Sequence, residues 1–329
     1  MRAATIIDGR IEVVDRPVPQ PQDDLAIVRV HGAGLNRADL LQLAGNYPAP
    51  AGSPPDIPGL EVAGVVEALG PEARGLEIGA RVFGVAGGGA QAEYLAVPAA
   101  QCALVPDGLD LVTMGGAPEA FVTAHDALVT KAKLQPGEWV LVHAVGSGVG
   151  TTALQLANAL GARVVGTART QAKLERCHAL GLAHGIVPPL TDGKLDTDAL
   201  AWSVLEATDG GAHVTIDLAG GSYVEADIAA ATLYGRIVLV GSIAGIRATL
   251  PIHLVMAKRL TIIGTVLRAR DAQEKAAATD AFVRDVVPLL ADGRVAPIVD
   301  AVLPLDRASD AYELVASDAT FGKVILDCR

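Results

Sequence analysis

The chain has 329 residues, 51% of them hydrophobic, which is enough for two domains with substantial cores. Its formal net charge is −11, from 37 acidic and 26 basic side chains, and this argues against nucleic acid or an anionic membrane as the partner. The three cysteines, Cys102, Cys177 and Cys328, indicate neither a disulfide framework nor a metal site, because they are odd in number and far apart. With no apolar signal segment after Met1, we expect a cytoplasmic protein.

Residues 1–119 have the pattern of a β-rich domain. Short runs of apolar, mostly branched residues predict strands at 5–7, 11–14, 25–31, 59–70 and 79–84. Residues 35–43 have the apolar spacing of a short helix. The proline-rich stretch 47–58 cannot form regular structure, so we expect it to be an ordered wall or a lid. The strand-and-turn pattern as a whole is typical of an antiparallel barrel.

Strands and helices alternate from residue 120 to residue 267. Six strands are expected, at 140–142, 162–168, near Ile186, 213–218, 236–240 and 260–263. Helices are expected between them at 151–160, 170–180, 197–207 and 222–232. This is the pattern of an α/β, doubly wound parallel sheet, which binds ligands at the carboxyl ends of its strands. Residues 268–329 follow with further helices and strands, and we expect this tail to rejoin the first domain.

The stretch from Trp139 to Lys173 holds the strongest functional signal. It reads as strand, glycine loop, helix and strand, in the order that a nucleotide-binding βαβ unit requires. Gly146, Gly148 and Gly150 let the backbone turn tightly, and the free N–H groups at the start of the next helix can hold a pyrophosphate. Gly148-x-Gly150-x-x-Ala153 matches the usual fingerprint in letters, but its position relative to the strand leaves the register open. The same glycine cluster, with Gln155 and Asn158, makes this uncharged run unsuitable as a membrane span.

The residues after the second strand select the nucleotide. NAD-binding folds usually place an acidic residue there, which binds the ribose 2′-hydroxyl. Residues 161–172 contain no acidic side chain, whereas Arg169, Thr170 and Lys173 offer two cations and a hydroxyl. A 2′-phosphate suits such a group, so the sequence favours NADPH. The alternative is that Arg169 and Lys173 form only the solvated start of a helix.

With these residues in view, the whole chain resembles the medium-chain dehydrogenase/reductase superfamily, and within it the zinc-free NADPH:quinone oxidoreductases, the ζ-crystallin-like group. The matching segments are 35–39, 58–64, 87–94, 118–124, 143–150, 220–223, 267–271 and 322–323. The resemblance implies a GroES-like, β-barrel-type catalytic domain at 1–119 and 268–329. It also implies a Rossmann cofactor domain at 120–267, and a homodimer that pairs near Leu260.

The positions that hold catalytic zinc in related enzymes carry other residues here. The matching places hold Asn36 or its neighbours, Leu60 within 59–61, and Pro118-Glu119, and Leu60 has no metal-binding atom. We therefore expect no metal. Oxidation of an alcohol requires a Lewis acid, but reduction of a quinone or a conjugated enone does not. The resemblance thus implies a metal-free, NADPH-dependent reduction of a quinone.

The resemblance also implies roles for individual residues. On the cofactor side these are Thr123, Val145, Gly146, Ser147, Gly148, Val149, Arg169, Thr170, Lys173, Gly241, Ser242, Ile243, Thr265, Leu267 and Lys323. On the substrate side they are Asn36, Asp39 and Tyr47, with Tyr47 or water as the source of the proton. Asn36 and Asp39 have the simpler reading that they cap a helix, and Tyr47 that it packs on the proline loop.

The sequence departs from the family pattern at one place and leaves two alternative functions open. Members of this group often place a tyrosine after the third Rossmann strand, where it contacts the 2′-phosphate, but this chain has Pro188 there. The phosphate pocket is therefore expected to have one contact fewer. An enone or enoyl-thioester reductase on the same scaffold is the nearest alternative function, and a non-catalytic NADPH-binding protein is a more distant one.

Overall fold

The computed structural model describes residues 1–329, which divide into two compact units. The first unit combines Met1–Val122 with Leu267–Arg329, and the second is Thr123–Val266. No helix in either unit is both long enough and apolar enough to span a lipid bilayer.

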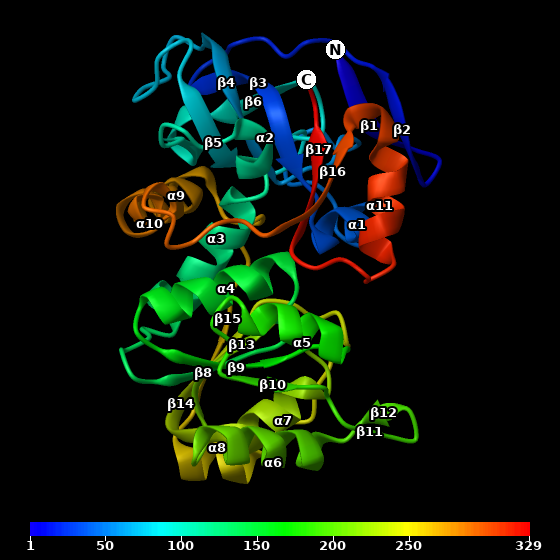
Figure 1. The fold of residues 1–329 in the computed structure, drawn as a ribbon. Helices are drawn as coiled ribbons and strands as arrows, with labels where there is room; N and C mark the ends of the chain where they lie inside the picture. Colours follow the sequence, from blue (N-terminus) through cyan, green and yellow to red (C-terminus); the bar gives the residue numbers. More distant parts are fainter. The chain divides into compact units, whose positions relative to one another are not determined.

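The first unit is built on a seven-stranded sheet that joins segments from both ends of the chain. Its order is β16-β17-β3-β4-β5-β7, and β6 also pairs with β3. The late strand β17 runs antiparallel to the early strand β3, and the two lie side by side, red and blue, in Figure 1. The strands of the unit, including a separate β1–β2 hairpin, are β1 (Arg2–Ile7), β2 (Arg10–Asp15), β3 (Leu25–Gly34), β4 (Glu61–Leu69), β5 (Arg81–Val85), β6 (Tyr94–Pro98), β7 (Cys102–Leu104), β16 (Val299–Pro304) and β17 (Lys323–Asp327).

Short helices cover this sheet and its ends. In α11, Ala308, Ala311 and Tyr312 recur at a spacing of three and four residues, so they share one face, and all three are buried in the core with Val324 and Leu326 of β17. The helices are α1 (Arg37–Leu43), α2 (Leu111–Met114), α3 (Pro118–His125), α9 (Ala272–Asp285), α10 (Val287–Ala291) and α11 (Ala308–Ala316), with 3₁₀ turns η1 (Ala99–Gln101) and η3 (Leu305–Arg307). Helix α3 begins in the first unit and continues into the second.

The second unit is a six-stranded parallel sheet in the order β10-β9-β8-β13-β14-β15. Its central strand β8 is entirely buried, as expected for a run of branched and apolar residues covered on both faces. The strands are β8 (Trp139–Val142), β9 (Arg163–Thr167), β10 (His184–Ile186), β13 (Ala212–Asp217), β14 (Ala231–Leu239) and β15 (Thr261–Gly264). From β8 the chain adds β9 and β10 on one side of the sheet and then β13, β14 and β15 on the other. This reversal of strand order confirms the doubly wound topology expected from the sequence.

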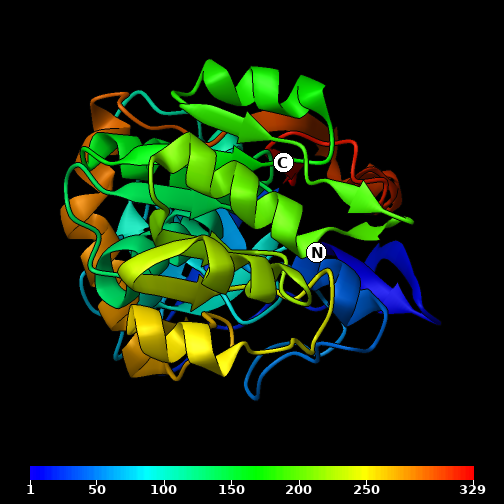
Figure 2. The ribbon, with the colours of Figure 1, turned by 90° about the horizontal axis from the view of Figure 1, so that it is seen from below.

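Helices lie on both faces of this second sheet. In Figure 1, α4 and α5 cover one face, and α6, α7 and α8 cover the other; Figure 2 shows these three helices from below. The side chains of Ser147, Thr170 and Asp196 cap the first turns of α4, α5 and α6. The helices are α4 (Gly148–Ala159), α5 (Gln171–His178), α6 (Thr197–Thr208), α7 (Tyr223–Ala230) and α8 (Ile252–Lys258), with a π-helical segment η2 (Asp126–Lys131).

Three features of the second unit differ from the sequence-based expectation. Helix α8 was not predicted; none of its residues is fully buried, and only Leu254 and Val255 pack partly against the core. Strand β14 begins at Ala231, where we expected the end of a helix; a register shift in its pairing with β13 admits the extra residues. A small hairpin of β11 (Leu190–Thr191) and β12 (Lys194–Leu195) follows β10, in a segment for which the sequence predicted no element.

Candidate functional site

The glycine loop of the second unit lies between β8 and α4. Ser147 is the N-cap of α4, and its hydroxyl accepts a hydrogen bond from Gly150 N at 3.1 Å. The amides of Gly148 and Val149 precede that bond and face out from the helix start, where the helix dipole favours an anion. Gly150 has no room for a side chain, since a Cβ atom would lie 2.3 Å from Ala144 O. Val145 is fully buried against Gly166, so only its main chain can meet a ligand.

The cationic segment expected to bind the 2′-phosphate follows the carboxyl end of β9. Arg169 and Thr170 are exposed and Lys173 is half-buried on the first turn of α5. The Thr170 hydroxyl accepts a hydrogen bond from Lys173 N at 3.4 Å, so it serves as the helix cap. Tyr223, at the start of α7, is close enough for electrostatic interaction with Arg169. Burial raises the pKa of the Tyr223 phenol, and the Arg169 guanidinium opposes that rise.

A fully buried polar cluster lies at the same ends of the strands. His143 Nε2 is 2.7 Å from Asp227 Oδ1, and its Nδ1 is 2.9 Å from Thr167 Oγ1. The Tyr223 ring packs edge-on against the imidazole at 4.8 Å. The second carboxylate oxygens of Asp217 and Asp227 are buried without a hydrogen-bond partner.

The electrostatics of this cluster favour a retained proton. Burial lowers the pKa of His143, but the Asp227 carboxylate outweighs it and the net change is upward. Burial raises the pKa of Asp227 to about 6. Through His143 the cluster connects Thr167, at the end of β9, with Asp227 on α7. Sequence reasoning used His143 only as a motif letter and missed its partner, because Asp227 lies 84 positions further along the chain.

The residues expected around the nicotinamide differ in how exposed they are and in which hydrogen bonds they make. Thr123 is half-buried on α3, and Thr265 Oγ1 donates a hydrogen bond to Asp126 Oδ2 at 2.8 Å. The loop Gly241–Ile243 follows β14, with Gly241 N bonded to Asp217 O and Ile243 63% exposed. Leu267 belongs to the first unit and is buried there.

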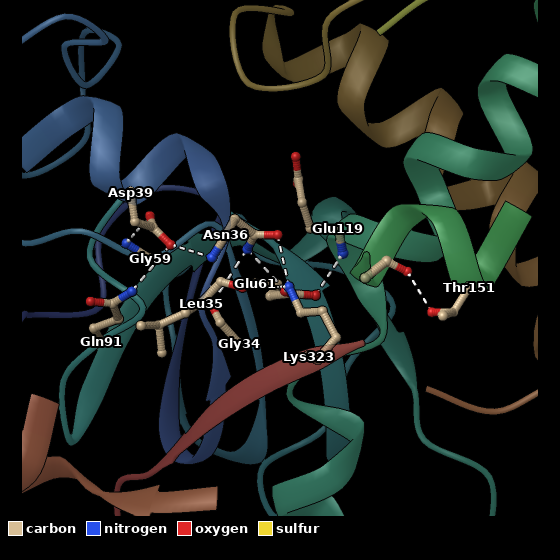
Figure 3. A network of polar contacts seen from close by, with 11 residues as sticks. Gly34, Leu35, Asn36, Asp39, Gly59, Glu61, Gln91, Glu119, Thr151 and Lys323 are labelled. Atoms are coloured by element: carbon tan, nitrogen blue, oxygen red, sulfur yellow. Dashed lines mark hydrogen bonds and ion pairs between the residues drawn. The ribbon is translucent and has the colours of Figure 1, made fainter. Parts of the chain in front are cut away.

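The first unit contains a buried ion pair between Lys323, the first residue of β17, and Glu61, the first residue of β4 (Figure 3). The pair lies beside the start of α1. Lys323 Nζ lies 2.5 Å from Glu61 Oε1, and the two side chains are 4% and 0% exposed. Lys323 also donates to Leu35 O at 2.7 Å and to Asn36 Oδ1 at 2.8 Å. An ammonium group has three donors, and all three have partners, so none is left for a nucleotide. We assign Lys323 to the support of Asn36 and Glu61.

Glu61 and Asn36 complete the network around that ammonium group. Asn36 Nδ2 donates to Glu61 Oε1 at 3.0 Å, and Glu119 N donates to Glu61 Oε2 at 3.0 Å. The amide plane of Asn36 is therefore held from both ends. Sequence reasoning did not identify Glu61 as a site residue. The only sequence signals for this ion pair were the Glu61 carboxyl group directly after Gly59-Leu60 and the Gly-Lys segment near the C-terminus.

Asp39 is fully buried next to this network. Its carboxylate accepts hydrogen bonds from Asn36 N at 2.8 Å, Gly59 N at 3.2 Å and Gln91 Nε2 at 3.3 Å. Burial raises the pKa of Asp39 to about 6, although these donors and Lys323 oppose the rise. Asp39 therefore caps the start of α1, as the simpler interpretation of the sequence expected. It also holds this helix start against the turn at Gly59.

Tyr47 lies on the proline-rich segment and packs against Arg268. The Arg268 guanidinium is 4.9 Å from the centre of the Tyr47 ring, and it donates to Tyr47 O at 2.9 Å. It also donates to Gly87 O at 2.8 Å and to Gln42 Oε1 at 2.6 Å, which ties three segments of the first unit together. Burial, and then the nearby Glu119 carboxyl, raise the pKa of the Tyr47 phenol.

The three positions that would hold zinc do not form a zinc site. Leu60 is an aliphatic, buried side chain, and Asn36 uses both ends of its amide within the protein. No group of three or more His, Cys, Asp or Glu side chains in residues 1–329 is arranged to hold a metal ion. The donor set therefore does not fit a tetrahedral zinc centre.

Two family models match the chain. "Alcohol dehydrogenase GroES-like domain" covers residues 22–107, and "Zinc-binding dehydrogenase" covers residues 148–283. The GroES-like character expected for the first unit is thereby confirmed, together with the Rossmann-like parallel sheet of the second. The zinc named in the second model is not matched by ligands in this chain.

Individual relatives match over nearly the whole length. The human quinone oxidoreductase is 30% identical over 343 residues, covering 99% of this chain and 97% of that protein. The crystal structure of the quinone oxidoreductase from Thermus thermophilus, also determined with NADPH, has a TM-score of 0.82 and 28% identity, over 99% of this chain and 100% of that one. A phenolphthiocerol/phthiocerol polyketide synthase subunit from Mycobacterium tuberculosis is 30% identical over 311 residues, which are 93% of this chain but only 14% of that much longer protein.

The buried ion pair makes a stability prediction. Replacing Lys323 by Met leaves the Glu61 carboxylate buried without its countercharge, and we expect a loss of about 3–5 kcal/mol in the free energy of unfolding. Chemical denaturation checks this. The double variant Lys323→Met/Glu61→Gln should recover part of the loss. Arg307→Met, which breaks the exposed pair with Asp310, should change stability by less than about 1 kcal/mol. Equal effects of Lys323→Met and Arg307→Met would contradict the assignment.

Proposed function

Because this chain belongs to the quinone oxidoreductase-like family of the medium-chain dehydrogenase/reductase superfamily, we propose that it is an NADPH-dependent reductase of quinones that works without a metal. The observation that carries the cofactor choice is the segment after β9, which has two basic side chains and no acidic one. The observation that carries the chemistry is the set of side chains at the zinc positions, because Leu60 has no metal-binding atom and the Asn36 amide is engaged at both ends within the protein.

The second unit has the features that a dinucleotide needs. The missing Cβ at Gly150 lets the start of α4 pack on the backbone of Ala144 and Val145. The amides of Gly148 and Val149 at this helix start suit a pyrophosphate. Arg169 and Lys173 are assigned to the 2′-phosphate, with Thr170 holding the turn between them. The loop Gly241–Ile243, Thr123, Thr265 and Leu267 are assigned to the nicotinamide end. When bound, NADPH supplies the hydride.

The first unit is assigned the substrate contacts. Tyr47 presents a half-buried ring held by Arg268, so it is assigned to the substrate. Asn36 is half-buried, but Glu61 and Lys323 engage both ends of its amide, so we assign to it a contact through the face of that amide and not a hydrogen bond. Asp39 is fully buried and fully engaged, so it acts by positioning Asn36 and Gly59. A planar, electron-poor ring suits this combination of an aromatic face and amide groups.

A second function, reduction of a conjugated enone or enoyl thioester, is favoured by one observation. The phenolphthiocerol/phthiocerol polyketide synthase subunit matches 93% of this chain at 30% identity. The two functions share the hydride and differ in where the proton is delivered. A quinone needs it on oxygen, whereas an enone must finally receive it on carbon.

We also propose a cytoplasmic homodimer that pairs through β15 and α8. β15 is the outer strand of the second sheet, and α8 beside it has no buried residue. Ile252 and Met256 of α8 are 62% and 68% exposed, which is unusual for apolar side chains on one short helix. All three cysteines are free and buried, in keeping with a reducing compartment.

The direct test of the reaction is NADPH oxidation with a panel of quinones and conjugated enones, with and without a chelator. We expect turnover of at least one quinone, a preference for NADPH over NADH, and no effect of the chelator. Loss of activity with chelator that zinc restores would contradict the metal-free scheme. Turnover of enones alone would favour the second function.

Arg169→Ala tests the phosphate site. Because hydrogen bonds to a charged phosphate contribute roughly 1.5–3 kcal/mol, NADPH affinity should fall roughly 10- to 100-fold, with NADH affinity nearly unchanged. Fluorescence titration of both nucleotides measures this. Arg163→Ala is the matched control, because Arg163 starts the same strand β9 and stacks over Trp139 at 4.3 Å. A parallel fall in NADPH and NADH affinity would show that Arg169 does not read the 2′-phosphate.

The dimer is tested by Ile252→Glu/Met256→Glu, which places two charges on α8. Sedimentation should then detect a monomer in place of a dimer. Trp202→Glu, at a side chain 69% exposed on α6, is the control and should leave the dimer intact. A wild-type monomer, or a dimer that survives the α8 substitutions, would contradict this interface.

A further inference from the structure

The main chain of Glu119 is held at the start of α3 by a hydrogen bond to Glu61, whereas its carboxyl group takes no part in that bond. The Glu119 N–H donates to Glu61 Oε2, so the buried ion pair with Lys323 fixes the first turn of the helix. Gly116, just before it, packs so closely on β17 that a Cβ atom there would lie 3.1 Å from Ile325 Cδ1. Figure 3 shows the Glu119 carboxyl group pointing away from the Glu61–Lys323 pair. The backbone is therefore fixed while the carboxyl group projects from the network.

The charges around this carboxyl group come from every element packed near it. Burial is the largest influence and raises the pKa of Glu119 to about 8. The groups that act on it, in order, are the carboxylate of Glu61 on β4, the ammonium of Lys323 on β17, Asp39 on α1 and the ammonium of Lys275 on α9. Tyr47 on the proline-rich segment also interacts with it. At neutral pH the carboxyl group therefore carries its proton.

Two cations near this carboxyl group are not committed to the ion pair, Lys275 and Arg268. The Arg268 guanidinium is held by Gly87 O, Tyr47 O and Gln42 Oε1, so Lys275 is the candidate for stabilising the carboxylate. Its side chain is 7% exposed and lies on the long helix α9. Burial lowers the pKa of its ammonium group, and Glu119 opposes that change. The interaction is mutual, since Lys275 lowers the pKa of Glu119. A cation at this place stabilises the carboxylate that remains after a proton has left.

Tyr47 is less suited to deliver a proton than Glu119. Burial raises the pKa of its phenol above the ordinary value of 10, and the Glu119 carboxylate raises it further. An efficient acid has a pKa close to the working pH, because it must be protonated and yet able to release the proton. The carboxyl group satisfies both conditions near neutrality, and the phenol satisfies only the first.

We propose that Glu119 is the acid that protonates the substrate oxygen, and that Lys275 is a positioning residue for the carboxylate that this step leaves behind. The inference rests on the proposed function, in that a quinone or enone that takes up hydride gains negative charge on its oxygen. The O–H bond of Glu119 breaks as an O–H bond forms on the substrate oxygen. The carboxylate then recovers a proton from water, so that one hydride and one proton are consumed in each turnover.

The kinetic test is the pH dependence of kcat with a quinone or an enone, for wild type and Glu119→Gln. In wild type, kcat should fall above about pH 8, because only the protonated carboxyl group donates. Glu119→Gln should lower kcat at pH 7 by about 10²–10⁴-fold and remove the alkaline decline. Glu67→Gln, on an exposed part of β4 paired with Arg29, should behave as wild type. A Glu119→Gln enzyme that keeps its rate or its alkaline decline would overturn the proposal.

Lys275→Met separates positioning from packing. Removing this cation raises the pKa of Glu119, so the alkaline decline of kcat should move to higher pH. A merely structural role for Lys275 would lower the rate at all pH values and leave the midpoint in place, which would overturn the positioning role. Tyr47→Phe should leave the midpoint near that of wild type.

A binding measurement tests the acid without turnover. The probe is 4-nitrophenolate, an oxygen anion whose absorption reports its ionisation, added to the protein without nucleotide. Its dissociation constant, corrected for the ionised fraction, should rise about tenfold per pH unit above pH 8 in wild type and stay flat in Glu119→Gln. Circular dichroism of the variant, and a Glu119→Asp variant that keeps an acid, control for misfolding. A flat wild-type titration would overturn the proposal.

Failure of the proposed function and failure of the Glu119 assignment give different results in these experiments. If wild type reduces no quinone or enone, the proposed function is wrong, and the phenolate titration still reports on Glu119. If wild type turns over but Glu119→Gln keeps the alkaline decline, only the assignment of the acid is wrong.

Discussion

The ion pair between Lys323 and Glu61 is the interaction on which the first unit's site depends. A buried charge is strongly destabilising unless its partners are in place, and here every donor of the ammonium group and both carboxylate oxygens are used. The pair connects the last strand of the chain to β4 in a sheet built from both termini. Through it the amide of Asn36 and the first turn of α3 are held in fixed positions. The carboxyl group of Glu119 then projects from a rigid base.

The fold was largely predictable because its signals are local. The strand–loop–helix–strand order at Trp139–Lys173, the alternating pattern to residue 267 and the helix spacing in α11 each follow from neighbouring residues. What escaped prediction lacks a clear local signal: no residue of α8 is fully buried, and the early start of β14 depends on an irregular pairing with β13. The two compact units divide the chain at 122 and 267, within a few residues of the boundaries expected from the sequence at 119 and 267.

The site was predictable to a smaller extent, and the reason is sequence separation. Lys323 was expected at the cofactor, but its oxygen partners on Leu35 and Asn36 lie 288 and 287 positions away, near the N-terminus. The partner of His143, Asp227, is 84 positions away. Glu119 was identified as occupying a zinc-ligand position, and its chemistry emerged only when its burial and neighbouring charges were known. Residue types and motifs indicate which positions matter, and only the packing shows what each side chain can still offer.

In the proposed reaction, an acid takes the role that a metal could otherwise have in neutralising charge on the substrate. Leu60 is an aliphatic, buried side chain, and burial raises the pKa of the Glu119 carboxyl group to about 8. An acid that gives up its proton neutralises the developing charge directly, which a metal does only electrostatically. The chemistry is then confined to substrates whose oxygen takes up charge upon reduction.

A crystal structure with NADPH and a phenolic product analogue tests this claim most directly, through the distance between the Glu119 carboxyl oxygens and the ligand oxygen. The account predicts a hydrogen bond, about 2.5–3.0 Å, from Glu119 to that oxygen and no metal beside it. A ligand oxygen bound instead to Tyr47 or to a zinc ion, with Glu119 turned away, would contradict it.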